Sequence, residues 1–341
     1  MMDVHIRTKG HAGRITLHRP KALNALTYQM CLDIEAALDT WRDDDAVKLV
    51  VIDAEGDKAF CAGGDIQDLY DTAVAGDFAY GQRFWRDEYR LNQKIFNYPK
   101  PYVALMQGFV MGGGVGVSCH GSHRVVCDTS QIAMPECGIG LIPDVGGSLM
   151  LARAPGRLGE YLGTTGARMD AGNAIYAGFA DCYVPKDDWS TLLRALEQTG
   201  DVGVIDAHTR PAPTASFSTL QVDIDRHFAS TDMNDVMASL GEDETEFAAS
   251  AIKLLRKKSP LSAAATPTLI ERVRAADTIE AALSEEYKFT YRAAQHGDFI
   301  EGIKATIIDR SHTPKWRFAT LADVGQSDVE TMLAPLGDAA L

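Results

Sequence analysis

The first half of the chain alternates between short apolar segments and segments in which apolar residues have helical spacing. Residues 13–20 predict a strand that ends at a proline, and the apolar runs 47–56 and 99–110 predict buried strands. Residues 124–136 predict two further short strands. Thr27 can cap a helix, and the alternation as a whole predicts an α/β fold. The apolar positions of the helix after Thr27 are Met30, Ile34, Leu38 and Trp41.

The second half of the chain has a different pattern. Residues ~200–222 are rich in Pro, Ala, Ser and Thr, which is typical of a linker. From Asp232 onward apolar residues recur at helical spacing, which predicts a helical region. We therefore expect a core over 1–200, a linker-like segment over 201–230, and a helical C-terminal region over 231–341 that packs on the core.

Composition and charge narrow the classes of protein to which the chain can belong. Of its 341 residues, 46% are hydrophobic and 23% are charged, so the chain can bury a large core and is not intrinsically disordered. Its 33 basic and 47 acidic residues give a formal net charge of −14, which repels phosphate backbones and anionic lipids. We expect neither a nucleic acid nor a membrane as a partner.

Targeting signals and cysteine spacing bear on the compartment. No segment reaches the ~18–20 apolar residues of a membrane span, and the N-terminus lacks the apolar segment of a secretory signal. The six cysteines are scattered and form no CxxC pair, which is typical of reduced thiols in a cytosolic protein. We therefore predict a cytoplasmic protein.

Two glycine-rich segments each follow a predicted buried strand, Phe60–Ile66 (FCAGGDI) and Met111–Gly116 (MGGGVG). Glycine lets backbone N–H groups approach a ligand closely, and two such groups aimed at one point form an oxyanion hole. Alternatively, these glycines only permit tight turns or close helix packing. A dinucleotide-binding G-x-G-x-x-G that starts at Gly112 would need glycine where Val117 stands, and no P-loop sequence occurs.

Two carboxylates are the best candidates for acid–base chemistry. Glu136 and Asp144 lie eight residues apart in the apolar, glycine-punctuated segment Met134–Gly147. Apolar surroundings raise the pKa of a carboxyl group, which suits proton transfer near neutral pH. Alternatively, both are solvated loop acids or caps of the following helix. His120 and His123 have metal-like spacing, but no third ligand is evident nearby, so we predict no metal site.

Four segments, in their order along residues 10–190, resemble the crotonase (enoyl-CoA hydratase/isomerase) superfamily: RPKALNAL, AFCAGGDI, MGGGVG and MPECGIGLIPDVGG. The resemblance implies an α/β spiral of stacked ββα units with, here, a mainly helical C-terminal region. It implies that the core over 1–200 binds an acyl-CoA substrate and holds an oxyanion with the N–H groups of Gly64 and Gly113. It implies no cofactor beyond the CoA of the substrate, and a homo-oligomer, trimer or hexamer. The residues expected along the CoA are Lys21, Ala22, Lys58 and Ala62.

Within the superfamily the chain more closely resembles the 3-hydroxyisobutyryl-CoA hydrolases of valine degradation. Hydratases that resemble this chain carry a second glutamate at the position of Gly116. They usually carry glycine at the position of Asp144, where the hydrolases have aspartate. The C-terminal segment 259–316 resembles that of the hydrolases. So does RDEYRLNQKI, a match that places Glu88 in the substrate pocket, although a solvated helix carboxylate is the alternative.

The resemblance implies hydrolysis of the thioester of 3-hydroxyisobutyryl-CoA, with 3-hydroxypropionyl-CoA as a second substrate, to the free hydroxy acid and CoA. Glu136 either deprotonates the attacking water or attacks the carbonyl carbon to give a mixed anhydride. Asp144 either binds the 3-hydroxyl of the substrate or assists proton transfer to the leaving thiol. The expected substrate-binding residues are Glu88, Gly113, Glu136 and Asp144.

Two other functions stay open. An enoyl-CoA hydratase or dienoyl-CoA isomerase of the same superfamily would carry a further acid at Gly116 and would lack the long C-terminal region. A non-catalytic acyl-CoA-binding protein would be expected to lose the carboxylates of its pocket, whereas Glu136 and Asp144 are both present. Release of free thiol from an acyl-CoA separates the hydrolase from both alternatives.

Overall fold

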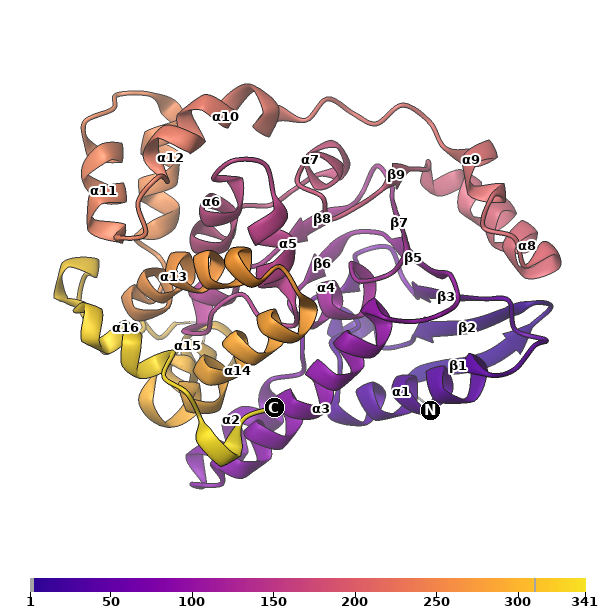
Figure 1. The fold of residues 1–341 in the computed structure, drawn as a ribbon, viewed down its shortest axis with the longest axis horizontal. Coiled ribbons are helices and arrows are strands. Elements are labelled where there is room, and N and C mark those ends of the chain that lie inside the picture. The colour runs from indigo at the N-terminus through magenta and orange to yellow at the C-terminus, as the bar shows by residue number, and fades with distance from the viewer. Residues whose placement is uncertain (1–2, 310) are drawn as a thin grey trace. The chain divides into compact units, whose positions relative to one another are not determined.

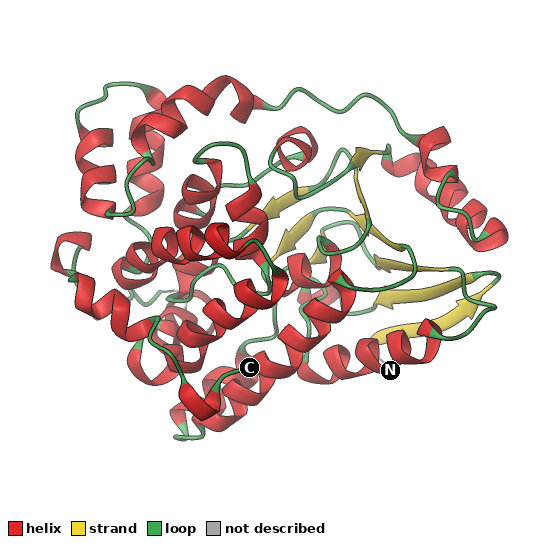
Figure 2. Cartoon of the chain, viewed as in Figure 1, coloured by secondary structure: helices red, strands yellow, loops and turns green. Residues whose placement is uncertain are grey.

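The computed structural model describes residues 3–309 and 311–341, and the chain divides into two compact units built from interleaved segments. Unit 1 consists of the segments up to Asp65, Arg90–Ala133 and Arg168–Ser216. Unit 2 consists of Ile66–Tyr89, Met134–Ala167 and Phe217–Leu341. All the strands of the described chain belong to unit 1, and the regular structure of unit 2 is helical (Figure 1, Figure 2).

Unit 1 contains two sheets. The larger has the strand order β1-β2-β3-β5-β7-β9, in which β1 and β2 are antiparallel and the other neighbours are parallel. Its strands are β1 (Val4–Lys9), β2 (Ala12–Leu17), β3 (Leu49–Ala54), β5 (Tyr102–Met106), β7 (His123–Val126) and β9 (Cys182–Tyr183). The smaller sheet is parallel and consists of β4 (Ala59–Cys61), β6 (Phe109–Met111) and β8 (Gln131–Ala133).

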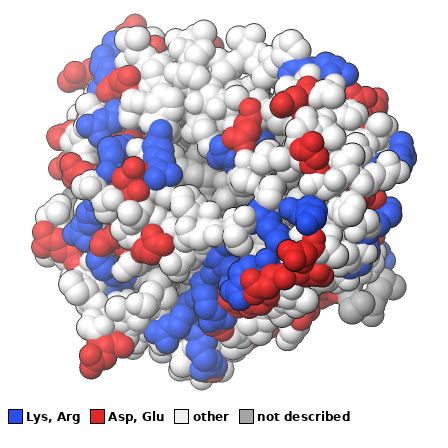
Figure 3. All heavy atoms as spheres, turned by 45° about the vertical axis from the view of Figure 1, so that its right-hand side comes forward, with Lys and Arg blue, Asp and Glu red and all other residues white. Residues whose placement is uncertain are grey.

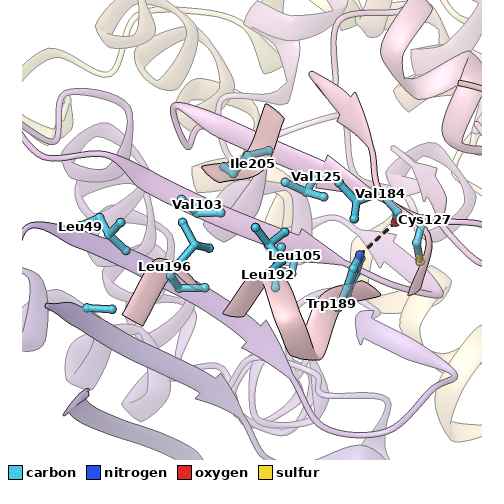
Figure 4. Close-up of a cluster of buried hydrophobic side chains, with 12 residues drawn as sticks. Leu49, Val103, Leu105, Val125, Cys127, Val184, Trp189, Leu192, Leu196 and Ile205 are labelled. Atoms are coloured by element: carbon cyan, nitrogen blue, oxygen red, sulfur yellow. Dashed lines mark hydrogen bonds between the residues drawn. The ribbon is translucent and has the colours of Figure 1, made fainter. Parts of the chain in front are cut away.

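One face of the larger sheet is covered by helix α8 (Trp189–Thr199). Leu192 and Leu196 lie one helical turn apart, so both point into the same apolar cluster (Figure 4). The indole N–H of Trp189 donates to the carbonyl oxygen of Val184 over 3.0 Å, which satisfies its polar atom inside the core. The other helices within unit 1 are α1 (Tyr28–Arg42), α4 (Gly113–Ser118), α7 (Ala171–Tyr176) and α9 (Val204–His208).

Unit 2 is organised around helix α13 (Pro260–Ala276). This helix packs against α5 (Gly147–Arg153), α6 (Leu158–Thr165) and α14 (Ile279–His296). Ser259 caps α13 by accepting a hydrogen bond from the N–H of Ser262, and Pro260 takes the first helical position. Helix α3 (Phe78–Phe96) runs from unit 2 into unit 1. The remaining helices are α2 (Gln67–Val74), α10 (Ser216–His227), α11 (Met233–Gly241), α12 (Glu246–Leu255), α15 (Phe299–Ile303) and α16 (Gln326–Met332). Single helical turns are η1 (Pro20–Ala22), η2 (Glu136–Ile139), η3 (Lys186–Asp188), η4 (Lys304–Ile308), η5 (Leu321–Asp323) and η6 (Gly337–Ala339).

Most elements predicted from the sequence are present. The strand predicted over 13–20 is β2, and the side chain of Thr27 caps α1 by accepting from the N–H of Met30 over 3.2 Å. The single strand predicted over 99–110 is wrong, because the chain forms β5 and β6 there, in different sheets. Gly108 separates them with φ of +56°, and a Cβ at this position would lie 2.2 Å from the carbonyl oxygen of Lys58.

The helical region predicted from residue 231 onward is present as α11 to α16. The linker-like segment 201–230 contains α9 and α10, and its role as a boundary between domains stays a prediction. Met1, Met2 and Arg310, which fall within predicted segments, lie outside the described residues. No helix in the described part of the chain is long and apolar enough to cross a membrane. Acidic and basic side chains are intermingled on the face drawn in Figure 3.

Candidate active site

Four carboxyl groups of unit 2 are buried together with a tyrosine. They come from separate elements: Glu88 from α3, Glu136 from η2, Asp144 from the loop before α5, and Glu286 from α14. The hydroxyl of Tyr89, on α3, lies 2.9 Å from Oδ2 of Asp144. Buried carboxyl groups are rare unless they are paired or functional, so this carboxyl cluster is the candidate catalytic centre.

The pKa values of the carboxyl cluster are raised. Burial raises the pKa of Asp144 to about 7, and the hydrogen bond from Tyr89 opposes that increase. Burial raises the pKa of both Glu88 and Glu136 well above the ordinary value, and the charge of Asp144 adds to each increase. The half-buried ammonium group of Lys258 opposes the increase at Glu136. The prediction that apolar surroundings raise the pKa values of Glu136 and Asp144 therefore agrees with the geometry.

Two carboxyl oxygens of the cluster have no partner. Oε1 of Glu88 and Oε2 of Glu136 are buried and make no hydrogen bond to any residue in the described part of the chain. A buried acceptor without a partner costs free energy of about 1–3 kcal/mol. Such atoms are the natural contact points for the polar groups of a substrate, and neither Glu88 nor Glu136 is a solvated surface acid.

Glu286 is held by a dense set of hydrogen bonds. Its Oε2 accepts from the N–H of Gly146 over 2.8 Å, and its Oε1 accepts from the N–H of Ser148 over 3.0 Å and from the Ser148 hydroxyl. Burial raises the pKa of Glu286 to about 8. No sequence motif points to Glu286, Tyr89, Ser148 or Thr290. One signal was available for Glu286, because it falls in the buried stripe of α14, three residues after Leu283.

The two glycine-rich turns lie next to each other in unit 1. They follow β4 and β6, which are neighbouring parallel strands. Gly63 has φ of +117°, and a Cβ there would lie 3.6 Å from the carbonyl oxygen of Met111. A Cβ at Gly114 would lie 2.5 Å from the carbonyl oxygen of Cys61, so the start of α4 approaches β4 at a distance that only glycine permits.

The predicted oxyanion donors are Gly64 and Gly113. Among the hydrogen bonds of the described residues, none is donated by the N–H of Gly64 or that of Gly113. Neighbouring N–H groups are used, since Ala62 and Asp65 donate to carbonyl oxygens of the loop before α1. Gly113 begins α4, where an N–H has no acceptor within its own helix. An oxyanion donor must have an N–H group that is not used within the chain, and both N–H groups meet this requirement among the described residues. Their role as oxyanion donors stays a prediction.

The loop predicted to lie along CoA is fixed by Asn24. The side-chain amide of Asn24 donates to the carbonyl oxygens of Glu55 and Ala59, each over 2.9 Å. The N–H of Ala62 donates to the carbonyl oxygen of Leu23 over 3.0 Å, which joins this loop to the turn after β4. Of the residues predicted to contact CoA, Lys21, Ala22 and Lys58 are exposed and Ala62 is half-buried.

The unit assignments divide the predicted site residues into two groups. Unit 2 brings Glu88, Glu136 and Asp144 together, and within unit 1 Gly64 and Gly113 lie on two turns that neighbour each other.

One cluster of the described residues has ligand atoms close enough together to hold a metal ion, and it does not include His120 or His123. It is formed by His5 on β1, His18 directly after β2 and Glu55 directly after β3.

The sequence as a whole matches the family description of enoyl-CoA hydratase/isomerase over residues 12–333. The chain belongs to the enoyl-CoA hydratase/isomerase family. Among curated members, it is 38% identical to the Rattus norvegicus protein "3-hydroxyisobutyryl-CoA hydrolase, mitochondrial", over 98% of this chain and 89% of that protein. The resemblance drawn from the sequence motifs is therefore confirmed.

Solved structures of the enoyl-CoA hydratase/isomerase family are similar over the whole chain. One, described as an enoyl-CoA hydratase from Rhodobacter sphaeroides, has a TM-score of 0.97 and 54% identity, and the alignment covers 100% of this chain and 99% of that one. Another, described as a carnitinyl-CoA dehydratase from Mycobacterium thermoresistibile, has a TM-score of 0.94 and 41% identity, with 98% and 97% covered. The predicted fold class is confirmed, whereas the cytoplasmic location and the oligomer stay predictions.

Proposed function

We propose that this enzyme hydrolyses the thioester of 3-hydroxyisobutyryl-CoA, and also that of 3-hydroxypropionyl-CoA, a reaction that fits valine degradation. The observation that carries the proposal is the carboxyl arrangement: Asp144 is buried beside Glu136, whereas position 116 is a buried glycine within α4. Hydratases that resemble this chain carry a second glutamate at position 116 for the addition of water across a C=C bond. Thioester hydrolysis does not need it.

The proposed reaction uses the residues as follows. The N–H groups of Gly64 and Gly113 hold the carbonyl oxygen as it gains negative charge, and each such donor is worth about 3–4 kcal/mol in the transition state. Glu136 either takes a proton from water as that water adds to the carbonyl carbon, or adds to the carbon itself. In the second route the mixed anhydride is opened by water. The C–S bond breaks in both routes, the thiolate takes up a proton, and no cofactor besides the CoA of the substrate takes part.

Asp144 and Glu88 are proposed to recognise the acyl group. Asp144 either accepts a hydrogen bond from the 3-hydroxyl or supplies the proton to the leaving thiolate, and a pKa of about 7 suits both tasks. The unpartnered Oε1 of Glu88 is available to a polar group of the substrate. A 3-hydroxypropionyl group lacks one methyl, which changes binding by only about 1–3 kcal/mol. This is why both substrates are proposed.

Hydration of an enoyl-CoA is the second candidate, because the 54% identical structure from Rhodobacter sphaeroides is described as an enoyl-CoA hydratase. The curated relative from Rattus norvegicus is named a hydrolase instead. The glycine at position 116 favours the hydrolase, since the two-glutamate arrangement for hydration is incomplete.

Two assays on the purified chain separate these reactions. Thiol release is followed with a thiol-reactive dye from 3-hydroxyisobutyryl-CoA, 3-hydroxypropionyl-CoA and crotonyl-CoA. Loss of the enoyl-thioester absorbance is followed in parallel with crotonyl-CoA. The proposal expects rapid thiol release from both hydroxyacyl substrates and little hydration. Hydration without thiol release would contradict the proposal and favour the second candidate.

A further inference from the structure

The turn that carries Asp144 has an unusual backbone. The N–H of Gly147 donates to the carbonyl oxygen of Asp144 over 2.7 Å, which closes a four-residue turn. Both central residues have left-handed φ, +55° at Val145 and +77° at Gly146. Glycine adopts this conformation readily, but a β-branched valine does so rarely and only where its surroundings enforce it. The turn therefore needs support from elsewhere in the chain.

Glu286 supplies support on the far side of the turn. Its carboxyl group spans the turn and the first residues of α5, because one oxygen accepts from the N–H of Gly146 and the other accepts from the N–H and hydroxyl of Ser148. The side chain of Glu286 is fully buried, so water does not compete for these bonds. The backbone on the C-terminal side of Asp144 is thereby tied to α14.

The same helix also reaches the carboxyl group of Asp144. Thr290 lies four residues after Glu286, on the same face of α14. Its hydroxyl lies 3.4 Å from the hydroxyl of Tyr89, which lies 2.9 Å from Oδ2 of Asp144. One face of α14 therefore contacts the backbone next to Asp144 and the tyrosine that donates to its side chain.

We propose that α14 is the positioning element of the site and that Glu286 acts through Asp144. Glu286 holds the left-handed turn that aims the Asp144 carboxyl group, and it does not itself touch the substrate. The inference rests on the proposed function, because it assigns Asp144 a part in thioester hydrolysis. It also gives the C-terminal region a chemical role, since α14 is supplied by residues far along the chain from the glycine-rich turns.

A double-mutant cycle tests whether Glu286 acts through Asp144. The chains compared are the wild type, Glu286→Gln, Asp144→Asn and the double variant, each assayed for thiol release from 3-hydroxyisobutyryl-CoA. A misplaced reacting group costs about 100-fold, so we expect Glu286→Gln to lower kcat/KM by about 10–100-fold in the wild-type background. In the Asp144→Asn background the same change should cost less than about threefold, because the residue that Glu286 positions is already disabled.

The pH dependence of kcat/KM is a second readout, because it would not change if Glu286 had a purely structural role. Loss of the Glu286 support should loosen the turn and weaken the hydrogen bond from Tyr89 that lowers the pKa of Asp144, so in Glu286→Gln the limb of the kcat/KM profile that reports Asp144 should shift to higher pH. The ionisable groups that face Asp144 are Glu88, Tyr89, Glu136 and Glu286, and Lys258 faces Glu136.

A matched control is Glu160→Gln. Glu160 is another buried carboxyl group of unit 2, paired with Arg157 and Arg274, each over 2.9 Å. Its replacement should lower stability but leave kcat/KM per folded molecule and the pH profile unchanged. If Glu286→Gln does not fold, as judged by near-ultraviolet circular dichroism, Ser148→Ala takes its place in the cycle with an expected loss of about two- to fivefold.

The outcomes distinguish this inference from the function on which it rests. A wild-type chain that releases no thiol would contradict the proposed function. A chain that hydrolyses the thioester, loses activity in Asp144→Asn, and loses the same further factor on Glu286→Gln in both backgrounds would overturn the positioning role alone. Loss confined to the background that retains Asp144 supports it.

Discussion

The hydroxyl of Tyr89 donates a hydrogen bond to Oδ2 of Asp144 over 2.9 Å, and both side chains are buried. Burial favours the neutral form of Asp144 and the hydrogen bond favours the charged form, so the two effects oppose each other and the pKa of Asp144 is raised to about 7. The carboxyl group can therefore accept or release a proton near neutral pH, as acid–base chemistry requires.

Replacing Tyr89 by Phe should move the titration of Asp144. Loss of the hydrogen bond removes the effect that lowers the pKa, so the limb of the kcat/KM profile that reports Asp144 should move to higher pH. The rate of thiol release at pH 7 should fall about tenfold. Tyr161→Phe is the control, since Tyr161 is also buried in unit 2 and packs against the rings of Phe217 and Phe228. An unchanged profile in Tyr89→Phe would contradict this account of Asp144.

The raised pKa of Asp144 should also appear in the pH dependence of stability. The folded chain holds this proton up to a pH of about 7, whereas the unfolded chain releases it near 3.8. The stabilisation is therefore fully present below the unfolded pKa and is lost as the pH rises through the folded one, by about 1.4 kcal/mol per pH unit. Urea unfolding between pH 4 and 7 should show a shallower decline for Asp144→Asn than for the wild type. Equal slopes would refute the assignment.

Gly114→Ala tests the geometry of the two glycine-rich turns. The added methyl would meet the carbonyl oxygen of Cys61 at 2.5 Å, so α4 must move away from β4 and carry the N–H of Gly113 with it. Loss of one oxyanion donor lowers kcat by about 10²–10³-fold. In Gly241→Ala the methyl meets nothing within 4 Å, so kcat should be unchanged. Wild-type kcat in Gly114→Ala would argue against an oxyanion hole at these turns.

Leu192→Ala should weaken the core of unit 1 without touching the chemistry. Leu192 is fully buried in the cluster between α8 and the larger sheet. Truncation of such a side chain costs about 2–5 kcal/mol in the free energy of unfolding, which denaturant titration measures. The kcat of the folded fraction should stay at the wild-type value. A loss below about 1 kcal/mol would mean that α8 does not cover this core as described.

Local signals in the sequence predicted those parts of the fold that local interactions determine. Thr27 predicts the start of α1 because its side chain accepts a hydrogen bond from the N–H of the third residue of the helix. The glycine-rich turns can be predicted because only glycine fits their backbone. Strand β1 was not predicted, since its residues are mostly polar, half of them are exposed, and the strand is defined by pairing with β2. The break at Gly108 was also missed, because the approach of Lys58 is a tertiary contact.

The candidate site likewise contains residues that local patterns predict and residues that only tertiary contacts define. Glu136 and Asp144 could be selected because both lie in one apolar, glycine-punctuated segment, and Glu88 could be selected through the resemblance. Glu286 lies more than one hundred residues further along the chain, and its importance comes from hydrogen bonds to Gly146 and Ser148 that no local pattern announces.

The most direct test of thioester hydrolysis at the carboxyl cluster compares Glu136→Gln with the wild type. Glutamine keeps the shape of Glu136 but can neither take a proton from water nor attack the carbonyl carbon. Thiol release from 3-hydroxyisobutyryl-CoA should therefore fall by about 10²–10⁴-fold, while binding of the CoA ester, measured by calorimetry, stays near the wild-type value. Glu160→Gln, assayed alongside, should retain wild-type kcat. Full thiol release by Glu136→Gln would contradict the central claim.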